Sequence, residues 1–472
     1  MTATASRWAL ALLLVSATLA AEAAPTRGEI RVRLLERAAP THVEIAGVDG
    51  TLSVRTVSGA SLMDLPADTP LRLVRVGDEL EVQTPTLTLR ALGLRIQASA
   101  EISVTAQAPQ RLEPRRYQGQ LVLGPAPDTE EALMLVNTVD LEHYVACVVS
   151  REYGFDDLEG SKAQAVLART YALRRPAAAS AAYDLPDHTG AQVYEGTARL
   201  TRVAVQAAQA TAGQILTYRG APIEAVYFSS SGGHTVNNED VWASAPVPYL
   251  RGRPDPYDAL TSPHTSWTSR VNREALLQAL SRTYRMQAEG FVVEERSADG
   301  RVKTIQVLGT RPRTVPGNAF RLLISRQFGT DQLRSTFFEV RRAGGDYVFE
   351  GQGFGHGVGM SQYGALAQSQ QGRSYTEILS FYFEGTRLTT LEGGSPLLAT
   401  PAPPPAADVP VRRVTLTTPP PSPASPPPTD LPLQPATAEP APPSTTVIVP
   451  TAPPPTDPPA PRKKKKKRRI GW

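Results

Sequence analysis

Cysteine is almost absent from this sequence, since Cys147 is the only one among 472 residues. An intrachain disulfide and a cysteine-rich zinc site are therefore excluded, because each needs more than one thiol. Cys147 lies between Ala146 and Val148 in an apolar run. A thiol in such a place behaves as a small buried hydrophobe, and we expect that role here.

A long apolar run is also lacking. The N-terminal segment from Trp8 to Ala20 is shorter than the roughly 20 residues that span a bilayer. It follows the basic Arg7 and precedes small residues, which is the pattern of a cleavable export signal, with a buried helix or a retained anchor as the alternative. We therefore expect a signal peptide at residues 1–23 and an exported protein in the periplasm, the cell envelope or the extracellular space.

An excess of positive charge is lacking outside the C-terminus. The net charge is +4, and the eight basic residues at 462–469 leave 4 − 8 = −4 for the rest of the chain. This argues against a uniformly basic nucleic-acid-binding fold, so we expect no nucleic acid as a partner. Residues 401–461 hold 24 of the 44 prolines. We therefore predict a disordered Pro-rich linker at 391–461 and a basic tail at 462–472 that could bind anionic envelope polymers or have no specific partner.

Several familiar catalytic motifs are missing too. The sequence has no G-x-S-x-G serine elbow and no H-E-x-x-H pair for zinc. Residues 351–362 form a glycine-rich loop, but its glycines recur at every second position, unlike a dinucleotide fingerprint. We therefore expect no cofactor and no metal. His356 in this loop could be a ligand, an acid or base, or a structural hydrogen-bonding group.

Alternation of polar and apolar residues is the main pattern from residue 28 to 110. Thr51–Val57 and Leu71–Val76 are examples, and such period-two patterning predicts a β-rich N-terminal region. Further strands are predicted at 117–123, 133–137 and 223–227, with helical spacing between them. The expected fold class is α+β, with a β-rich N-terminal subdomain at 28–110 and a mixed α/β core at 111–390.

Three helix boundaries in this core involve polar residues. An apolar-faced helix should end near Glu152, Ser161 could cap the next helix, and Ser361 should open another. Apolar surroundings raise the pKa of a carboxyl group, so Glu152 could be a general acid, although a solvated glutamate is the ordinary alternative. The turn at 229–235 combines serines with paired glycines, and either recognises a polar ligand or sugar through its backbone or is a tight polar turn.

Taken in order, these segments resemble the stage II sporulation protein D family. Residues 141–152 are close to the family pattern L-E-x-Y-L-x-G-V-V-P-S-E, and 162–173 are close to K-A-Q-A-V-A-A-R-T-Y-A-L. Residues 192–196, the turn at 229–235 and the loop at 353–365 follow in the same order. The likeness covers about residues 28–390, which makes 111–390 the expected catalytic domain.

The resemblance implies an exported lytic transglycosylase that cleaves peptidoglycan between N-acetylmuramic acid and N-acetylglucosamine and leaves 1,6-anhydro ends. It places the catalytic acid at Glu152. One carboxyl group can act as acid and then as base in such a reaction, whereas ordinary glycoside hydrolysis uses two. The expected partners are peptidoglycan glycan strands and a cell-wall amidase, and the expected substrate-binding residues are Ser231, Gly232, Gly233, His234, His356, Ser361 and Gln362.

The sequence departs from the family pattern beside the expected acid. Cys147, Ser150, Arg151 and Tyr153 stand where the family has Gly, Pro, Ser and Met. These changes support an alternative, a non-catalytic glycan-binding protein that activates a cell-wall amidase. Some family members hold zinc near the Ser-rich turn with His and Cys, but this chain has Phe228 and no cysteine there, so the metal is not carried over.

Overall fold

The computed structural model describes residues 28–174, 182–242, 244–391 and 412–414. The expected signal peptide, most of the Pro-rich linker and the basic tail lie outside these residues. Within them, no helix is both long enough and apolar enough to cross a membrane. The described chain combines helices and strands, which confirms the α+β prediction.

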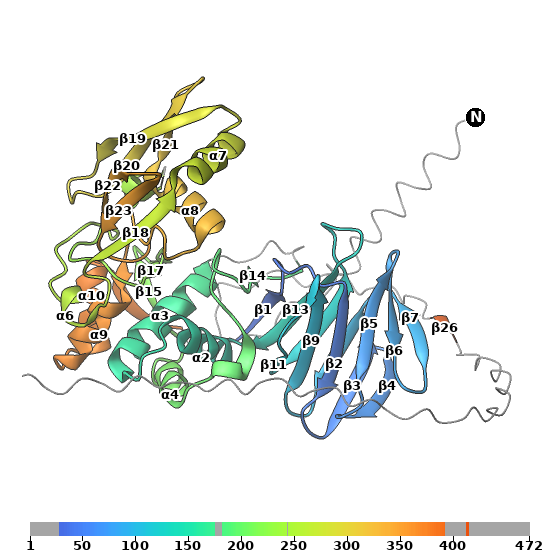
Figure 1. The fold of residues 1–472 in the computed structure, drawn as a ribbon. Coiled ribbons are helices and arrows are strands. Elements are labelled where there is room, and N and C mark those ends of the chain that lie inside the picture. Colours follow the sequence, from blue (N-terminus) through green and yellow to red (C-terminus); the bar gives the residue numbers. More distant parts are fainter. Residues whose placement is uncertain (1–27, 175–181, 243, 392–411, 415–472) are drawn as a thin grey trace, which may run out of the picture. The chain divides into compact units, whose positions relative to one another are not determined.

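Two sheets form the N-terminal region (Figure 1), and all their described strand pairs are antiparallel except the parallel pair of β1 (Glu29–Leu34) and β14 (Leu185–Pro186). Buried side chains alternate along their strands, as at Leu52 and Val54 in one sheet and Leu71 and Leu73 in the other, and all four belong to one hydrophobic core. The first sheet has the order β14, β1, β13 (Leu133–Asp140), β12 (Gln120–Pro125), β8 (Leu94–Ala98), β3 (Thr51–Thr56), β4 (Ser61–Pro66). The second has the order β10 (Gln110–Arg111), β9 (Ile102–Ala108), β2 (His42–Gly47), β5 (Leu71–Val76), β6 (Glu79–Gln83), β7 (Thr88–Ala91), β26 (Arg412–Val414), with β11 (Arg115–Tyr117) on β9.

The first sheet leads directly into the helical region. β12 pairs with β8, and β13 pairs with β1, so this sheet takes in strands from both sides of residue 110. Asp140 ends β13 and also caps the next helix, α2 (Leu141–Glu152), by accepting a hydrogen bond from His143 N at 2.9 Å. With no loop between strand and helix, the sheet fixes the start of α2 and therefore the position of Glu152 at its end.

The other long helices of this region pack on α2 or on α3 (Leu158–Arg174). α2, α3 and α4 (Arg202–Ala210) contact one another, and α9 (Gln362–Gln370) and α10 (Tyr375–Tyr382) contact α3 (Figure 1). α3 begins earlier than the predicted cap at Ser161, because Asp157 Oδ2 accepts the Gly160 N–H at 3.0 Å. The shorter elements are η1 (Gly196–Arg199), β15 (Gln214–Tyr218), β16 (Ala221–Pro222), β17 (Tyr227–Phe228), α5 (Asn238–Val241), α6 (Asp258–Thr261), β24 (Met360–Ser361) and β25 (Arg387–Thr390).

Two local predictions in this region have different outcomes. Ser361 is the N-cap of α9, as predicted, with its Oγ accepting the Gly364 N–H at 3.2 Å. The predicted strand at 223–227 is wrong for most of its length, since only its last residue belongs to a strand, β17. The backbone N–H of Glu224 donates to the Tyr249 hydroxyl at 2.9 Å, which takes it out of any ladder.

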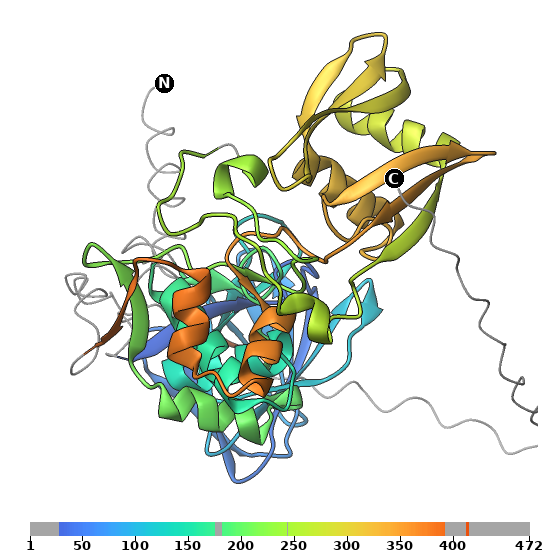
Figure 2. The same cartoon turned by 90° about the vertical axis from the view of Figure 1, so that its left-hand side faces the viewer.

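A second hydrophobic core, which the sequence patterns did not predict, lies between residues 267 and 349. Leu276, Phe291, Ile305, Phe320 and Phe349 are among its buried members. Figure 2 shows helices and strands of this core together, and α7 contacts β19 while α8 contacts β20. Its elements are β18 (Trp267–Asn272), α7 (Arg273–Tyr284), β19 (Ala288–Arg296), β20 (Val302–Gly309), β21 (Arg313–Pro316), α8 (Gly317–Phe328), β22 (Phe338–Ala343) and β23 (Asp346–Gly351).

Candidate active site

Glu152, the last residue of α2, lines a cavity of about 1090 Å³. The helix stops there because Gly154 adopts a left-handed backbone conformation, with φ at 65°, two residues later. Other parts of the cavity wall come from Gln192, from Tyr227 on β17, from α8 and from His356 in the glycine-rich loop. The expected catalytic carboxyl group therefore faces a space that a sugar could enter.

The carboxyl group of Glu152 is held by the backbone. Val193 N donates to Glu152 Oε1 at 2.8 Å, and Gln362 Nε2 donates to the main-chain oxygen of Glu152 at 3.1 Å. Burial raises the pKa of Glu152, while the Val193 hydrogen bond and the charge of Arg151 act in the opposite direction. A carboxyl group with a raised pKa keeps its proton to higher pH, which is the property that a general acid needs.

Glu224 is the other glutamate on the described part of the cavity wall. Its Oε2 lies 2.9 Å from Arg174 Nε, so the two side chains form an ion pair. Among the acids of the described cavity lining, Glu152 is therefore the one without an ion-pair partner. The cavity provides one available carboxyl group and not a matched pair.

His356 is neutral and is held on both sides of its ring. Val358 N donates to Nδ1 at 3.2 Å, which assigns the ring proton to Nε2, and Nε2 donates to Tyr227 O at 2.9 Å. Burial lowers the pKa of His356 to about 3, and the charge of Arg321 adds to this effect. The ring lies 5.4 Å from Phe228 and 5.2 Å from Trp242, measured between centroids. His356 thus joins the glycine-rich loop to β17 and contributes to an aromatic wall.

Most of the Ser-rich turn surrounds a buried carboxylate, that of Asp258, and of its residues Ser229 lines the cavity. Asp258 Oδ1 accepts from Ser231 N at 2.8 Å and from Ser361 Oγ at 2.6 Å, and Oδ2 accepts from Ser230 Oγ at 2.7 Å and from Gly232 N at 3.0 Å. Asp258 has no exposed surface. These four donors tie the turn, α6 and the start of α9 together.

Two predicted residues at the end of the turn also make internal contacts. Gly233 N donates to Ser231 Oγ at 3.1 Å, and His234 Nδ1 lies 2.5 Å from Thr235 O. Gly232 has a φ of 66°, and a Cβ there would lie 2.8 Å from Gly353 N, so the turn packs closely on the glycine-rich loop. Of the predicted substrate-binding residues, the structure places His356 and Gln362 at the cavity with Glu152, and the following outside its described lining: Ser231, Gly232, Gly233, His234 and Ser361.

The residues that depart from the family pattern make contacts outside the cavity lining. Ser150 Oγ donates to a backbone carbonyl of its own helix at 2.8 Å. Arg151 Nε donates to Glu195 Oε2 at 2.8 Å, and the Tyr153 hydroxyl donates to Asp157 Oδ2 at 2.8 Å. Cys147 is free and buried, as predicted, and burial raises the pKa of its thiol to about 12. None of the four lines the cavity.

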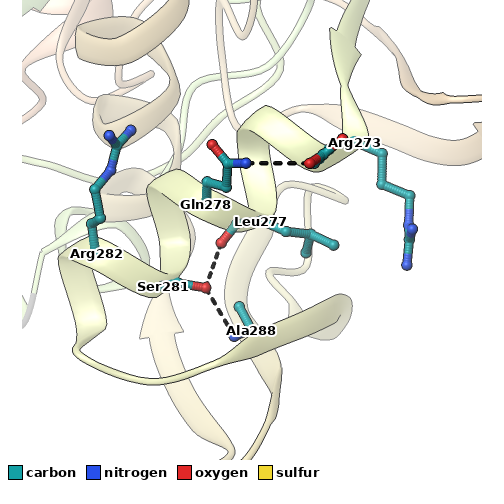
Figure 3. Close-up of a pocket in the computed structure, with 7 residues that line it drawn as sticks. Arg273, Leu277, Gln278, Ser281, Arg282 and Ala288 are labelled. Carbon is teal, nitrogen blue, oxygen red and sulfur yellow. Dashed lines mark hydrogen bonds between the residues drawn. The ribbon is translucent and has the colours of Figure 1, made fainter.

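A separate hollow of about 520 Å³ lies along α7 (Figure 3). Ser281, one of its lining residues, donates through Oγ to Leu277 O at 2.7 Å and accepts from Ala288 N at 3.0 Å. This hollow shares no lining residue with the Glu152 cavity. In the described ranges, no three His, Cys, Asp or Glu side chains gather as they would around a metal ion.

Comparison with known proteins identifies the family. Residues 129–218, which include α2 and Glu152, match the family model described as stage II sporulation protein. Over 271 residues the chain is 34% identical to stage II sporulation protein D of Bacillus amyloliquefaciens, covering 75% of that protein and 54% of this chain. This chain belongs to the stage II sporulation protein D family. The chain is also 34% identical over 274 residues to stage II sporulation protein D of Bacillus subtilis (strain 168), and this match covers 76% of that protein.

Two further matches are a more distant relative and a second domain model. It is 30% identical over 285 residues to the amidase enhancer of Bacillus subtilis (strain 168), covering 49% of this chain and 38% of that protein. Residues 256–359 match a model described as a domain of unknown function. This range contains the second hydrophobic core and α8, whose residues Asn318 and Arg321 line the Glu152 cavity.

Proposed function

We propose that this member of the stage II sporulation protein D family is a peptidoglycan lytic transglycosylase in which Glu152 is the catalytic acid and base. The observation that carries the proposal is the state of Glu152 in its cavity. It is the one acid of the described lining without an ion-pair partner, and burial raises its pKa. A single carboxyl group suits a reaction that needs no second carboxylate to activate water.

The reaction proceeds in two proton transfers at one side chain. Protonated Glu152 gives its proton to the oxygen between N-acetylmuramic acid and N-acetylglucosamine, and the bond from this oxygen to C1 of the muramic sugar breaks. The C6 hydroxyl of the same sugar then attacks C1 and returns its proton to Glu152. The products are a free N-acetylglucosamine end and a 1,6-anhydro end, and no water is consumed.

The two oxygens of Glu152 have different tasks in this scheme. Oε1 accepts the Val193 N–H at 2.8 Å, so the backbone fixes that oxygen and stabilises the carboxylate formed after the first transfer. Oε2 is then the oxygen that carries the proton. Gln362 holds the end of the helix through the main-chain oxygen of Glu152, so we assign it a positioning role.

The aromatic wall suits a sugar ring as the ligand. Phe228, Trp242 and Phe354 line the cavity with His356, and flat apolar faces of this kind can pack against the C–H groups of a pyranose. The neutral state of His356 leaves Glu152 as the proton donor at neutral pH. Because peptidoglycan lies outside the cytoplasm, the proposal includes export of the chain, and attachment of residues 462–472 to anionic envelope polymers.

A second candidate function is activation of a cell-wall amidase without catalysis. It is favoured by the likeness to the amidase enhancer of Bacillus subtilis. The departures from the family pattern around Glu152 give little support to a non-catalytic role, because Ser150, Arg151 and Tyr153 make contacts away from the cavity.

Digestion of purified glycan strands distinguishes the two functions. The protein is incubated with peptide-free glycan, and mass spectrometry counts new 1,6-anhydro ends. We expect the wild type to produce them and Glu152→Gln to produce none, with unchanged thermal unfolding. Glu131→Gln, the same chemical change in an exposed turn, is the matched control and should keep full activity. Undiminished anhydro product from Glu152→Gln would refute the proposal, and binding without product from the wild type would favour the amidase activator.

A further inference from the structure

The cavity that holds Glu152 also contains a cation without a counterion. Arg321, on the first turns of α8, lines the cavity together with Asn318. Its Nε donates to Asn318 Oδ1 at 3.0 Å, which fixes the guanidinium group but leaves its charge unbalanced. No Asp or Glu of the described chain forms an ion pair with Arg321.

The neighbouring charges do not compensate Arg321. Burial lowers its pKa to about 10, and the second contribution, the charge of Arg301, has the same sign. Arg301 has its own partner, Asp299, at 3.1 Å, and His356 is neutral. A pKa of about 10 still leaves Arg321 charged at neutral pH.

The other cation on the described cavity wall, Arg174, differs from Arg321 because it has a counterion. It is paired with Glu224 across 2.9 Å, so the two together are neutral. With Glu152 protonated, the described lining therefore has one net positive charge, located at Arg321. Taking a charge out of water without a partner costs several kcal/mol, and a fold tolerates this where a ligand completes the pair.

The N-terminus of α8 adds to the positive potential at this place. The helix has twelve residues, and its N-cap, Pro316, makes no side-chain capping hydrogen bond. The uncapped N-terminus of a helix has a partial positive charge, which favours an anion near its first turn. Asn318 and Arg321 both belong to the first five residues of α8, so the helix dipole and the guanidinium group act in the same direction.

We propose that Arg321 and the N-terminal turn of α8 form a carboxylate subsite for the glycan substrate of the Glu152 cavity. This inference rests on the proposed function for its substrate. Arginine binds a carboxylate with two parallel N–H···O bonds, which fixes orientation as well as affinity. A glycan strand offers two kinds of carboxylate: the lactyl group of N-acetylmuramic acid where no peptide is attached, and the carboxylates of a stem peptide where one remains.

The subsite is tested by binding, in the Glu152→Gln background, so that no substrate is consumed. Calorimetry measures the affinity for soluble peptide-free glycan fragments of two proteins, the Glu152→Gln variant and the double variant Glu152→Gln/Arg321→Gln. We expect the second change to weaken binding about 10- to 100-fold, as the loss of a charge-assisted bidentate contact does. Arg321→Lys should lie between the two, because it keeps the charge without the paired donors. Arg326→Gln, an exposed arginine on the same helix, is the matched control and should not change affinity.

The role of the carboxylate is tested by neutralising it. Glycan fragments whose carboxylates are converted to amides should bind with equal affinity to the Glu152→Gln variant and to the Glu152→Gln/Arg321→Gln variant. Dependence on Arg321 with peptide-free fragments assigns the subsite to the lactyl carboxylate, and dependence seen with peptide-bearing fragments alone assigns it to the stem peptide. The proposal is overturned if both proteins bind the charged fragments with equal affinity. It is also overturned if Arg321→Gln weakens the binding of amidated fragments as much as the binding of charged ones.

The outcome is separable from that of the proposed function. If Glu152→Gln still releases anhydro ends while glycan binding depends on Arg321, the catalytic assignment fails and the subsite stands. If the wild type and Arg321→Gln bind charged glycan equally while Glu152→Gln abolishes product, the subsite fails and the catalytic assignment stands. Thermal unfolding of each variant shows whether a loss of affinity reflects a loss of fold.

Discussion

Replacing Asp258 by Asn should destabilise the fold, because the carboxylate accepts four hydrogen bonds. Each oxygen of Asp258 receives one backbone N–H and one serine hydroxyl, with Ser231 N on Oδ1 and Gly232 N on Oδ2. An asparagine keeps one oxygen and presents an NH₂ group in place of the other. A serine hydroxyl can rotate and accept from this group, but a backbone N–H cannot. Either orientation of the amide therefore leaves one buried N–H without an acceptor.

The size of the effect follows from these contacts. An orphaned buried donor costs about 1–3 kcal/mol, and each remaining hydrogen bond loses roughly 1 kcal/mol when its acceptor is no longer charged. We therefore expect Asp258→Asn to lower the free energy of unfolding by about 3–5 kcal/mol. The exposed carboxylate of Asp331, which lies 3.7 Å from Arg334, makes a surface pair worth about 0–1 kcal/mol.

Urea denaturation of the wild type, Asp258→Asn and Asp331→Asn measures the difference, and hydrogen exchange locates it. Amide exchange should increase at residues 230–232 and 258–262 in Asp258→Asn and remain unchanged there in Asp331→Asn. A loss below about 1 kcal/mol for Asp258→Asn, in the range of a surface pair, would refute the view that this carboxylate organises the turn.

Activity should fall as the pH rises, because Glu152 must be protonated to act as the acid and burial raises its pKa above the ordinary value of a glutamate. The ratio kcat/KM should be highest at acidic pH and decrease about tenfold per unit above that pKa, whereas a rate that increases towards neutral pH would contradict the assignment. His356→Phe should cost about 1–3 kcal/mol in stability, because Tyr227 O loses its donor, and should leave the shape of the pH profile unchanged. A pH profile that changes its number of titrating groups would instead make His356 part of the chemistry. Arg151→Ser should keep the rate of anhydro-end release within about twofold, because its partner is the solvent-accessible Glu195 and exposed pairs contribute little. A tenfold loss in that assay would show that the altered flank matters for catalysis.

Sequence patterns were sufficient to predict the strands and helix ends that depend on residues close together in the chain. Period-two alternation predicted strands such as β3 and β5, and the Ser361 cap of α9 followed from residue type at the start of a helix. The position of Glu152 at the end of an apolar helix was predicted in the same way. These predictions depend on neighbours within a few residues, which a single sequence contains.

The remaining features depend on contacts between distant residues. Asp258 accepts from Ser231 and from Ser361, which is 103 positions further along the chain, and no local pattern relates these residues. Arg321 reaches the cavity only because the second hydrophobic core presents the first turn of α8 there. The Ser-rich turn looked equally suitable for a ligand or for a structural role, since small residues and glycines serve both, and the buried partner that distinguishes them was not visible from the turn itself.

Digestion of glycan strands in water labelled with oxygen-18 shows whether one desolvated carboxyl group at position 152 performs both proton transfers without water. We expect 1,6-anhydro ends that are lighter than a hydrolytic product by one water and free of the label. Reducing ends that contain oxygen-18 would show that water attacks C1, and Glu152 would then not work by internal transfer to the C6 hydroxyl.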